Sequence, residues 1–197
     1  RRDIFLLGRS LLALALVSPL CRLAATLVAG HMVQFMVLLV PAPLCLALAL
    51  GPCRGGLTVP TLAYGMIVWV WHLPGLYGRI LTEPALHLAA FLLLVLAAVW
   101  FWRAVLFAPR GGALLALATT LAHSGLLGAI LTFAGTPLYP RQAAGALAWG
   151  LTPLEDQQLA GLIMWVPGGL LYLGAALARS VRWLQGVPAL GGAGPRK

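Results

Sequence analysis

The sequence contains little charge. Only 9% of its 197 residues are Asp, Glu, Lys or Arg, where a soluble domain carries roughly 25%. Just four of these residues are acidic, so the net charge is +9. Apolar residues make up 61% of the chain, about 120 residues, and one membrane span needs about 20 of them. This composition excludes a soluble globular domain and a disordered chain, and it sets an upper bound of about six spans.

Cysteines are scarce, and the common catalytic motifs are absent. Cys21, Cys45 and Cys53 form no CxxC pair, which excludes a zinc ribbon and a thioredoxin-type centre. No GxSxG, Walker A or HExxH motif occurs. The basic residues form no stripe interleaved with aromatic or polar residues, which excludes a nucleic-acid surface. We therefore expect neither an enzyme nor a nucleic-acid-binding protein.

Six apolar runs separate along the chain. They cover residues 4–20, 28–50, 59–73, 84–107, 112–133 and 153–183. The runs are continuous rather than alternating, which excludes a β-barrel. The expected fold is an all-α polytopic transmembrane bundle of about six spans, formed as a single domain by residues 1–184. Residues 185–197, rich in Gly and Pro, are expected to form a flexible cytoplasmic tail. Because the first residue is Arg and not Met, a further span before residue 1 stays open.

The basic residues indicate the orientation of the bundle. With the N-terminus inside, nine basic residues lie at inner ends and three at outer ends, which is a positive-inside bias. The inner set is Arg1, Arg2, Arg54, Arg103, Arg110, Arg179, Arg182, Arg196 and Lys197, and the outer set is Arg22, Arg79 and Arg141. Tryptophans are expected at both interfaces, with Trp69 and Trp71 outside and Trp100, Trp102 and Trp183 inside. We predict that both ends of the chain are cytoplasmic.

This topology brings polar residues of four spans to the outer side of the membrane. They are His31, Gln34, His72, His87, Glu155, Asp156, Gln157 and Gln158. Polar groups in membrane spans usually face the bundle interior, and neutral imidazoles suit copper, zinc and iron. The predicted ligands are His31, His72, His87 and Asp156, with the thioether of Met32 or Met36 as a soft addition.

Other polar residues are expected to support the ligands. Thr152-Pro153-Leu154-Glu155 has the pattern of a capping box, so Glu155 is expected to cap a helix rather than bind metal. Gln34 and Gln157 are expected beside the ligands. His123 lies about ten residues, roughly 15 Å, below the outer surface, where it is expected to relay an ion or bond a neighbouring helix. Met residues in apolar helices more often serve packing.

Several motifs make the sequence resemble a known family. They are Ser18-Pro19-Leu20, His31-Met32-Val33-Gln34, Trp71-His72-Leu73-Pro74, Pro84-Ala85-Leu86-His87, the run 127–133, Pro137-Leu138-Tyr139-Pro140, and the runs 151–161 and 163–169. With these motifs the chain resembles the CtaG family of multi-span cytochrome c oxidase assembly factors associated with caa-type oxidases. The resemblance implies a multi-pass protein of the bacterial inner membrane that works with cytochrome c oxidase subunits, with copper as its metal.

The chain departs from the family pattern at two positions. Relatives read His-x-x-Gln-His in the second span and His-x-x-x-His in the fourth, whereas this chain has Phe35 and Phe91 at the second histidine positions. These substitutions weaken the predicted copper site. The leading hypothesis is an assembly factor that handles copper at the periplasmic face. The alternatives are an accessory oxidase subunit that binds no metal, and a haem-binding membrane protein.

Overall fold

The computed structural model describes residues 1–53, 55–140 and 142–185, and these residues form ten helices without any strand. The helices are α1 (Arg2–Val17), α2 (Pro19–Thr26), α3 (Val28–Leu39), α4 (Pro41–Leu50), α5 (Thr58–Trp71), α6 (Pro74–Ile80), α7 (Pro84–Phe107), α8 (Arg110–Phe133), α9 (Ala143–Leu147) and α10 (Pro153–Leu184). The all-α prediction is confirmed. The predicted tail lies, except for Gln185, outside the described residues.

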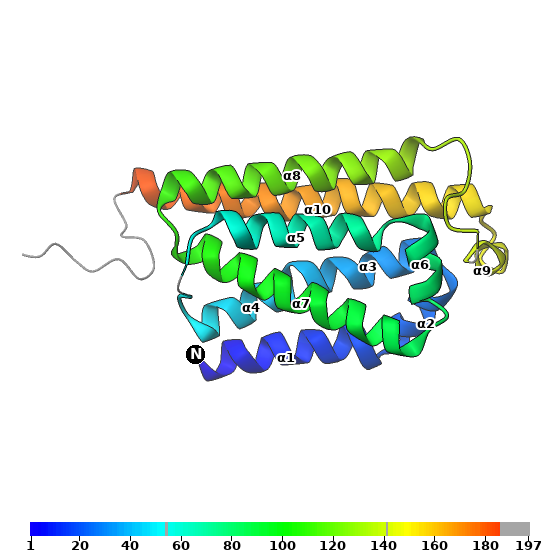
Figure 1. Ribbon diagram of the computed structural model, residues 1–197, viewed down its shortest axis with the longest axis horizontal. Coiled ribbons are helices and arrows are strands. Elements are labelled where there is room, and N and C mark those ends of the chain that lie inside the picture. The colour runs from blue at the N-terminus through cyan, green and yellow to red at the C-terminus, as the bar shows by residue number, and fades with distance from the viewer. Residues whose placement is uncertain (54, 141, 186–197) are drawn as a thin grey trace, which may run out of the picture.

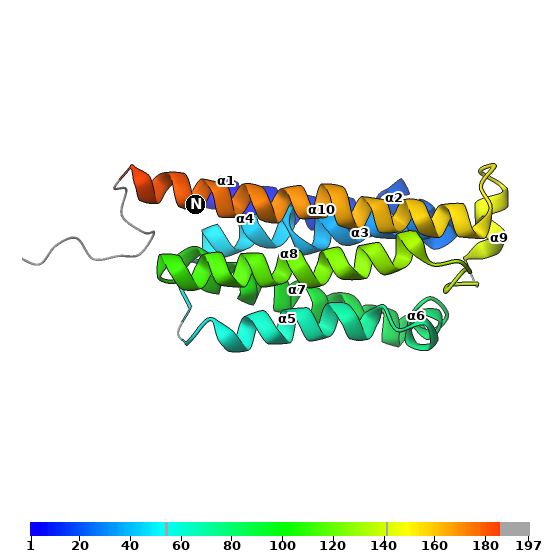
Figure 2. The same ribbon diagram turned by 90° about the horizontal axis from the view of Figure 1, so that it is seen from above.

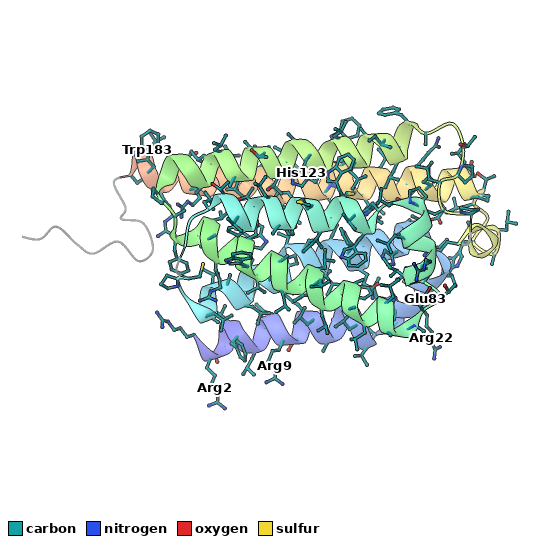
Figure 3. The ribbon with its side chains drawn as sticks, viewed as in Figure 1. Arg2, Arg9, Arg22, Glu83, His123 and Trp183 are labelled. Atoms are coloured by element: carbon teal, nitrogen blue, oxygen red, sulfur yellow. The ribbon has the colours of Figure 1, made fainter. Side chains whose placement is uncertain are left out.

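The long helices run side by side along the long axis of the molecule (Figures 1 and 2). The N-terminus and the C-terminal end of α10 lie at one end of this bundle, and the short helices α6 and α9 lie at the other (Figure 1). Figure 3 shows Arg2 and Trp183 toward the first end and Arg22 and Glu83 toward the second. The two ends of the described chain thus lie on the same side, while the assignment of that side to the cytoplasm stays a prediction.

Four helical segments are long and apolar enough to cross a membrane: Val28–Leu50, α7, Gly111–Phe133 and α10. The pair α1 and α2, bent by 49°, provides a fifth if it is one span. Helix α5 has 14 residues, about 21 Å at 1.5 Å per residue, which is shorter than the hydrocarbon core. All six apolar runs are therefore helical, and four or five of them qualify as spans, which is roughly compatible with the predicted six.

Prolines interrupt the first two apolar runs, and side chains compensate for the lost hydrogen bonds. Pro19 has no amide hydrogen to donate to the carbonyl of Ala15, and the side-chain amide of Gln34 donates to that carbonyl at 2.7 Å. Pro43 likewise leaves the carbonyl of Leu39 without its helical donor. The indole N–H of Trp102 donates to it at 2.8 Å. These contacts tie α1 to α3 and α3 to α7.

Small residues allow α8 and α10 to approach closely. A Cβ placed on Gly161 would lie 2.6 Å from the carbonyl oxygen of Gly128, so neither position accepts a larger side chain without a shift of the backbone. Such small-residue contacts are typical of membrane helices. The outer surface is apolar, as in Met66, Leu115 and Leu170, each more than 60% exposed. The bundle therefore has a lipid-compatible exterior.

Candidate functional site

The three histidines predicted as ligands occur at one end of the bundle. His31 lies in the first turns of α3, His72 follows the last residue of α5, and His87 lies in the first turn of α7. These positions all fall at the end that carries α6 and α9 (Figure 1). The alternation of span directions thus brings three imidazoles from three separate helices to one level.

His31 and His72 line a small cavity, which we call the histidine–aromatic cavity. Its lining residues are His31, Phe35, Trp71, His72, Tyr77, Ile80, Ala90, Phe91 and Leu94. The space inside, about 20 Å³ measured for a water-sized sphere, admits one water molecule or one ion. A haem, with its large macrocycle, does not fit this cavity. The geometry therefore suits a single small ligand.

The ring of His72 is held in one tautomer. Its Nδ1 lies 2.6 Å from the carbonyl oxygen of Val68, and because a carbonyl only accepts, Nδ1 donates the hydrogen. Nε2 consequently carries a lone pair. This atom is buried and has no hydrogen-bond partner within the part of the chain that the structure describes. A ring nitrogen fixed to a backbone carbonyl, with the other nitrogen free, is the usual arrangement of a metal-binding histidine.

His87 makes the same kind of hydrogen bond as His72, through Nδ1 to a backbone carbonyl, and His31 lies between aromatic rings. Nδ1 of His87 lies 3.3 Å from the carbonyl oxygen of Ile80, which again leaves the lone pair on Nε2. The ring of His31 is buried against Tyr77, with ring centroids 5.2 Å apart. His72 and His87 are therefore each fixed by a backbone hydrogen bond, while His31 is held by aromatic rings.

Phe35 and Phe91 separate the imidazoles. The Phe35 ring contacts His72 at 4.9 Å and His31 at 6.4 Å between centroids. The Phe91 ring contacts His87 at 4.5 Å and His31 at 6.2 Å. Within the described residues, no three His, Cys, Asp or Glu side chains come close enough to hold one metal ion. The two residues that depart from the family pattern thus occupy the space between the three histidines.

The acidic residues of α10 cap helices. The carboxylate of Asp156, a predicted ligand, accepts hydrogen bonds from the amides of Val28 and Ala29 at 2.7 and 3.0 Å, so it caps the N-terminus of α3. Glu155 and Thr152 form the predicted capping box, which is confirmed. Both carboxylates therefore bind backbone amides in this conformation.

The glutamines and methionines are also accounted for. Gln157 accepts a hydrogen bond from the amide of Leu138 and donates one to the carbonyl of Leu131. Gln34 binds the carbonyl of Ala15, as described above. Met32 is fully buried in the core, and Met36 lines a second cavity together with His123, away from His31. The structure therefore places neither methionine among the residues that line the histidine–aromatic cavity.

Two tyrosines near the site were not anticipated from the sequence. The Tyr139 hydroxyl donates to the carbonyl of His72 at 2.8 Å, and the Tyr77 hydroxyl donates to the side-chain oxygen of Gln142 at 2.7 Å. The two rings pack at 4.2 Å between centroids. Burial raises the pKa of both phenols, so they remain neutral donors. The only signal in the sequence is the Pro-Leu-Tyr-Pro motif that contains Tyr139.

Comparison with known families places the chain. The family model described as cytochrome c oxidase caa3 assembly factor (Caa3_CtaG) matches residues 1–53 and 57–186. Neither the curated proteins nor the solved structures give a match. The family match covers nearly the whole chain, including every residue that lines the histidine–aromatic cavity. The chain belongs to the family of cytochrome c oxidase caa3 assembly factors.

Proposed function

We propose that this protein handles copper for a haem-copper cytochrome c oxidase at the periplasmic face of the bacterial inner membrane. The observation that carries the proposal is the free Nε2 lone pair of His72, which lies buried in a one-ion cavity also lined by His31. The family supplies the role in oxidase assembly. Copper is the cargo in this account, taken up and passed on, and the oxidase is the acceptor.

The chemistry of the cavity favours copper over harder ions. The described residues that line it offer imidazole nitrogens and aromatic faces but no carboxylate. Magnesium and calcium prefer oxygen ligands, whereas imidazole suits copper. The faces of Trp71 and Phe35 can add cation–π attraction. With few ligands, binding is weak enough for release, which suits a protein that delivers its ion.

The periplasmic assignment follows from the charge bias. Arg2, Arg103 and Arg179, which belong to the predicted inner set, lie toward the end of the bundle opposite to the three histidines. The positive-inside rule favours a cytoplasmic assignment of that end. The histidine–aromatic cavity then lies toward the periplasmic end of the bundle. A reporter fused to the C-terminus tests this orientation, and a periplasmic signal would contradict it.

A deletion strain tests the function. Removing the gene should lower the amount of active oxidase, and added copper should partly restore it. Complementation with His72→Ala should restore less activity than complementation with Thr61→Ala, a buried polar residue in the first turn of α5, the helix that His72 follows. Unchanged oxidase content in the deletion strain, or equal rescue by the two variants, would contradict the proposal.

A second function is favoured by the two phenylalanines. Because Phe35 and Phe91 fill the space between the imidazoles, the protein could instead act as an accessory subunit that stays bound to the oxidase without metal. Stoichiometric co-purification with the oxidase, with no copper on the purified chain, would support this second function against the first.

A further inference from the structure

His123 presents two unused nitrogen atoms in the middle of the bundle. It is the fourteenth residue of the 24-residue helix α8 and lies about midway along the long axis (Figure 3). Both ring nitrogens are buried, and neither has a hydrogen-bond partner within the described residues. An imidazole always carries at least one hydrogen-bonding group to satisfy, and in a membrane interior an unsatisfied one is costly. A histidine with a purely structural role would be expected to have a hydrogen-bond partner, and His123 has none within the described residues.

The cavity around His123 brings two thioethers to it. Its lining includes Met36 from α3 and Met164 from α10, and both side chains are buried. Glycines on neighbouring helices leave room for the ligand atoms. A Cβ on Gly65 would lie 3.1 Å from Nε2 of His123, and a Cβ on Gly168 would lie 2.9 Å from Sδ of Met36. Three helices thus contribute one imidazole and two sulfur atoms to one space.

Of the other polar side chains that line this cavity, Tyr64, Tyr172 and Ser124 have hydrogen-bond partners, whereas the hydroxyl of Thr120 has none within the described residues. The hydroxyls of Tyr64 and Tyr172 share a hydrogen bond of 2.5 Å, and the Ser124 hydroxyl donates to the carbonyl of Thr120 at 2.7 Å. The cavity does not admit a water-sized sphere, so no water molecule bridges His123 to its neighbours, and a bound ion would contact the lining atoms directly with no water in between. The atoms left to bind a ligand are the nitrogens of His123, the hydroxyl oxygen of Thr120 and the thioethers of Met36 and Met164, and the soft atoms among them are the two sulfurs.

This donor set is neutral and soft. Thioethers and imidazole favour Cu(I). Hard divalent ions such as Mg²⁺ and Ca²⁺ prefer carboxylate oxygens, and the described lining contains no carboxylate. A monovalent ion also carries the smallest charge into a region of low dielectric constant. Methionine side chains rotate about three bonds and can close around an ion without water. The chemistry therefore points to one class of ligand.

We propose that His123, Met36 and Met164 form a Cu(I) site midway through the bilayer, separate from the histidine–aromatic cavity. The site does not depend on copper binding by His31, His72 or His87. It gives the protein a second place at which a soft monovalent ion is held, shielded from water and oxidants.

The test uses the full-length protein in detergent, without oxygen, titrated with Cu(I) against a competing chelator. In a background with His31→Ala, His72→Ala and His87→Ala, the chain should still bind about one Cu(I), with sulfur in its X-ray absorption spectrum. Adding Met36→Leu and Met164→Leu should weaken that binding at least roughly tenfold and remove the sulfur signal. Met66→Leu, an exposed methionine on α5, is the matched control and should change nothing.

The outcomes separate this site from the proposed function. Leu replaces Met with little change in volume, and melting temperatures verify that the variants fold. No Cu(I) in the triple-alanine background, or Cu(I) unaffected by the two leucines, would overturn the proposed site. Either result leaves the deletion-strain experiment to decide the role in oxidase assembly by itself.

Discussion

The carboxylate of Asp156, at the start of α10, accepts a hydrogen bond of 2.7 Å from the amide of Val28, at the start of α3. The second carboxylate oxygen accepts from Ala29, so one side chain satisfies two of the free amides that every helix N-terminus exposes. A negative charge is also favourable at that position of the helix dipole. Asp156 thereby fixes α3, and with it His31, against α10.

Replacing Asp156 with Ala should destabilise the fold. Two buried amides lose their acceptor, and the expected loss of unfolding free energy is about 1–3 kcal/mol. Unfolding in mixed micelles measures it. Asp3→Ala, which removes an exposed acidic residue in the first turn of α1, is the control and should have little effect. Equal losses for the two variants would show that the Asp156 cap contributes nothing.

The pair Arg79–Glu83 should make a small, pH-dependent contribution at the surface. The Arg79 guanidinium, 2.9 Å away, holds the pKa of the Glu83 carboxyl below its ordinary value of 4.5. When the pKa of a carboxyl is lower in the folded than in the unfolded state, the carboxyl stabilises the fold at a pH above its unfolded pKa. This contribution is lost as the pH falls through the folded pKa.

Glu83→Gln tests this contribution. Wild type should be slightly more stable than the variant at pH 7. The difference should begin to fall near the ordinary pKa of 4.5, vanish below the lower folded pKa, and shrink in high salt. Thermal unfolding across a pH series measures it. A difference that stays the same at pH 3 and in high salt would contradict the ionic origin.

Restoring the family histidines should tighten copper binding. Phe35→His and Phe91→His place imidazoles four residues from His31 and His87, on the same helix faces, at positions whose rings now contact the existing histidines. The affinity for Cu(I) should rise roughly tenfold or more, which corresponds to about 1.4 kcal/mol. Competition with a chelator measures the change. Phe133→His adds a histidine at an exposed position and should have no such effect.

Much of the fold could be predicted from the sequence because apolar runs of span length allow few structures. Helix α7 has the predicted bounds 84–107, and α10 begins at the predicted capping box. The short helices α6 and α9 were missed. They contain seven and five residues, too few to show a hydrophobic period, and packing rather than propensity stabilises them.

Trp102 shows where pattern reasoning failed. It was expected at the inner interface, yet its side chain is only 1% exposed, and its N–H binds the carbonyl that Pro43 leaves free. The sequence displays the proline but not the partner that compensates for it, because that partner comes from another helix. The same limit applies to Gln34, whose amide compensates for Pro19.

The candidate site could be predicted in part, because the alternation of span directions determines which residues lie at each end of the bundle. Alternating spans place His31, His72 and His87 at one end whatever the packing is. The engagement of Asp156 with α3 and the grouping of Met36 with His123 depend on how the helices rotate about their axes. No sequence period specifies that rotation when a helix is apolar on all sides, as α7 is.

The most direct test of the account is the amount of copper bound per chain by the purified protein. It is measured in the Met36→Leu, Met164→Leu background, so that only the histidine–aromatic cavity contributes. The account predicts about one ion per chain with the three histidines intact, because the cavity admits one, and none after His31→Ala, His72→Ala and His87→Ala. Equal copper in the two proteins would contradict it.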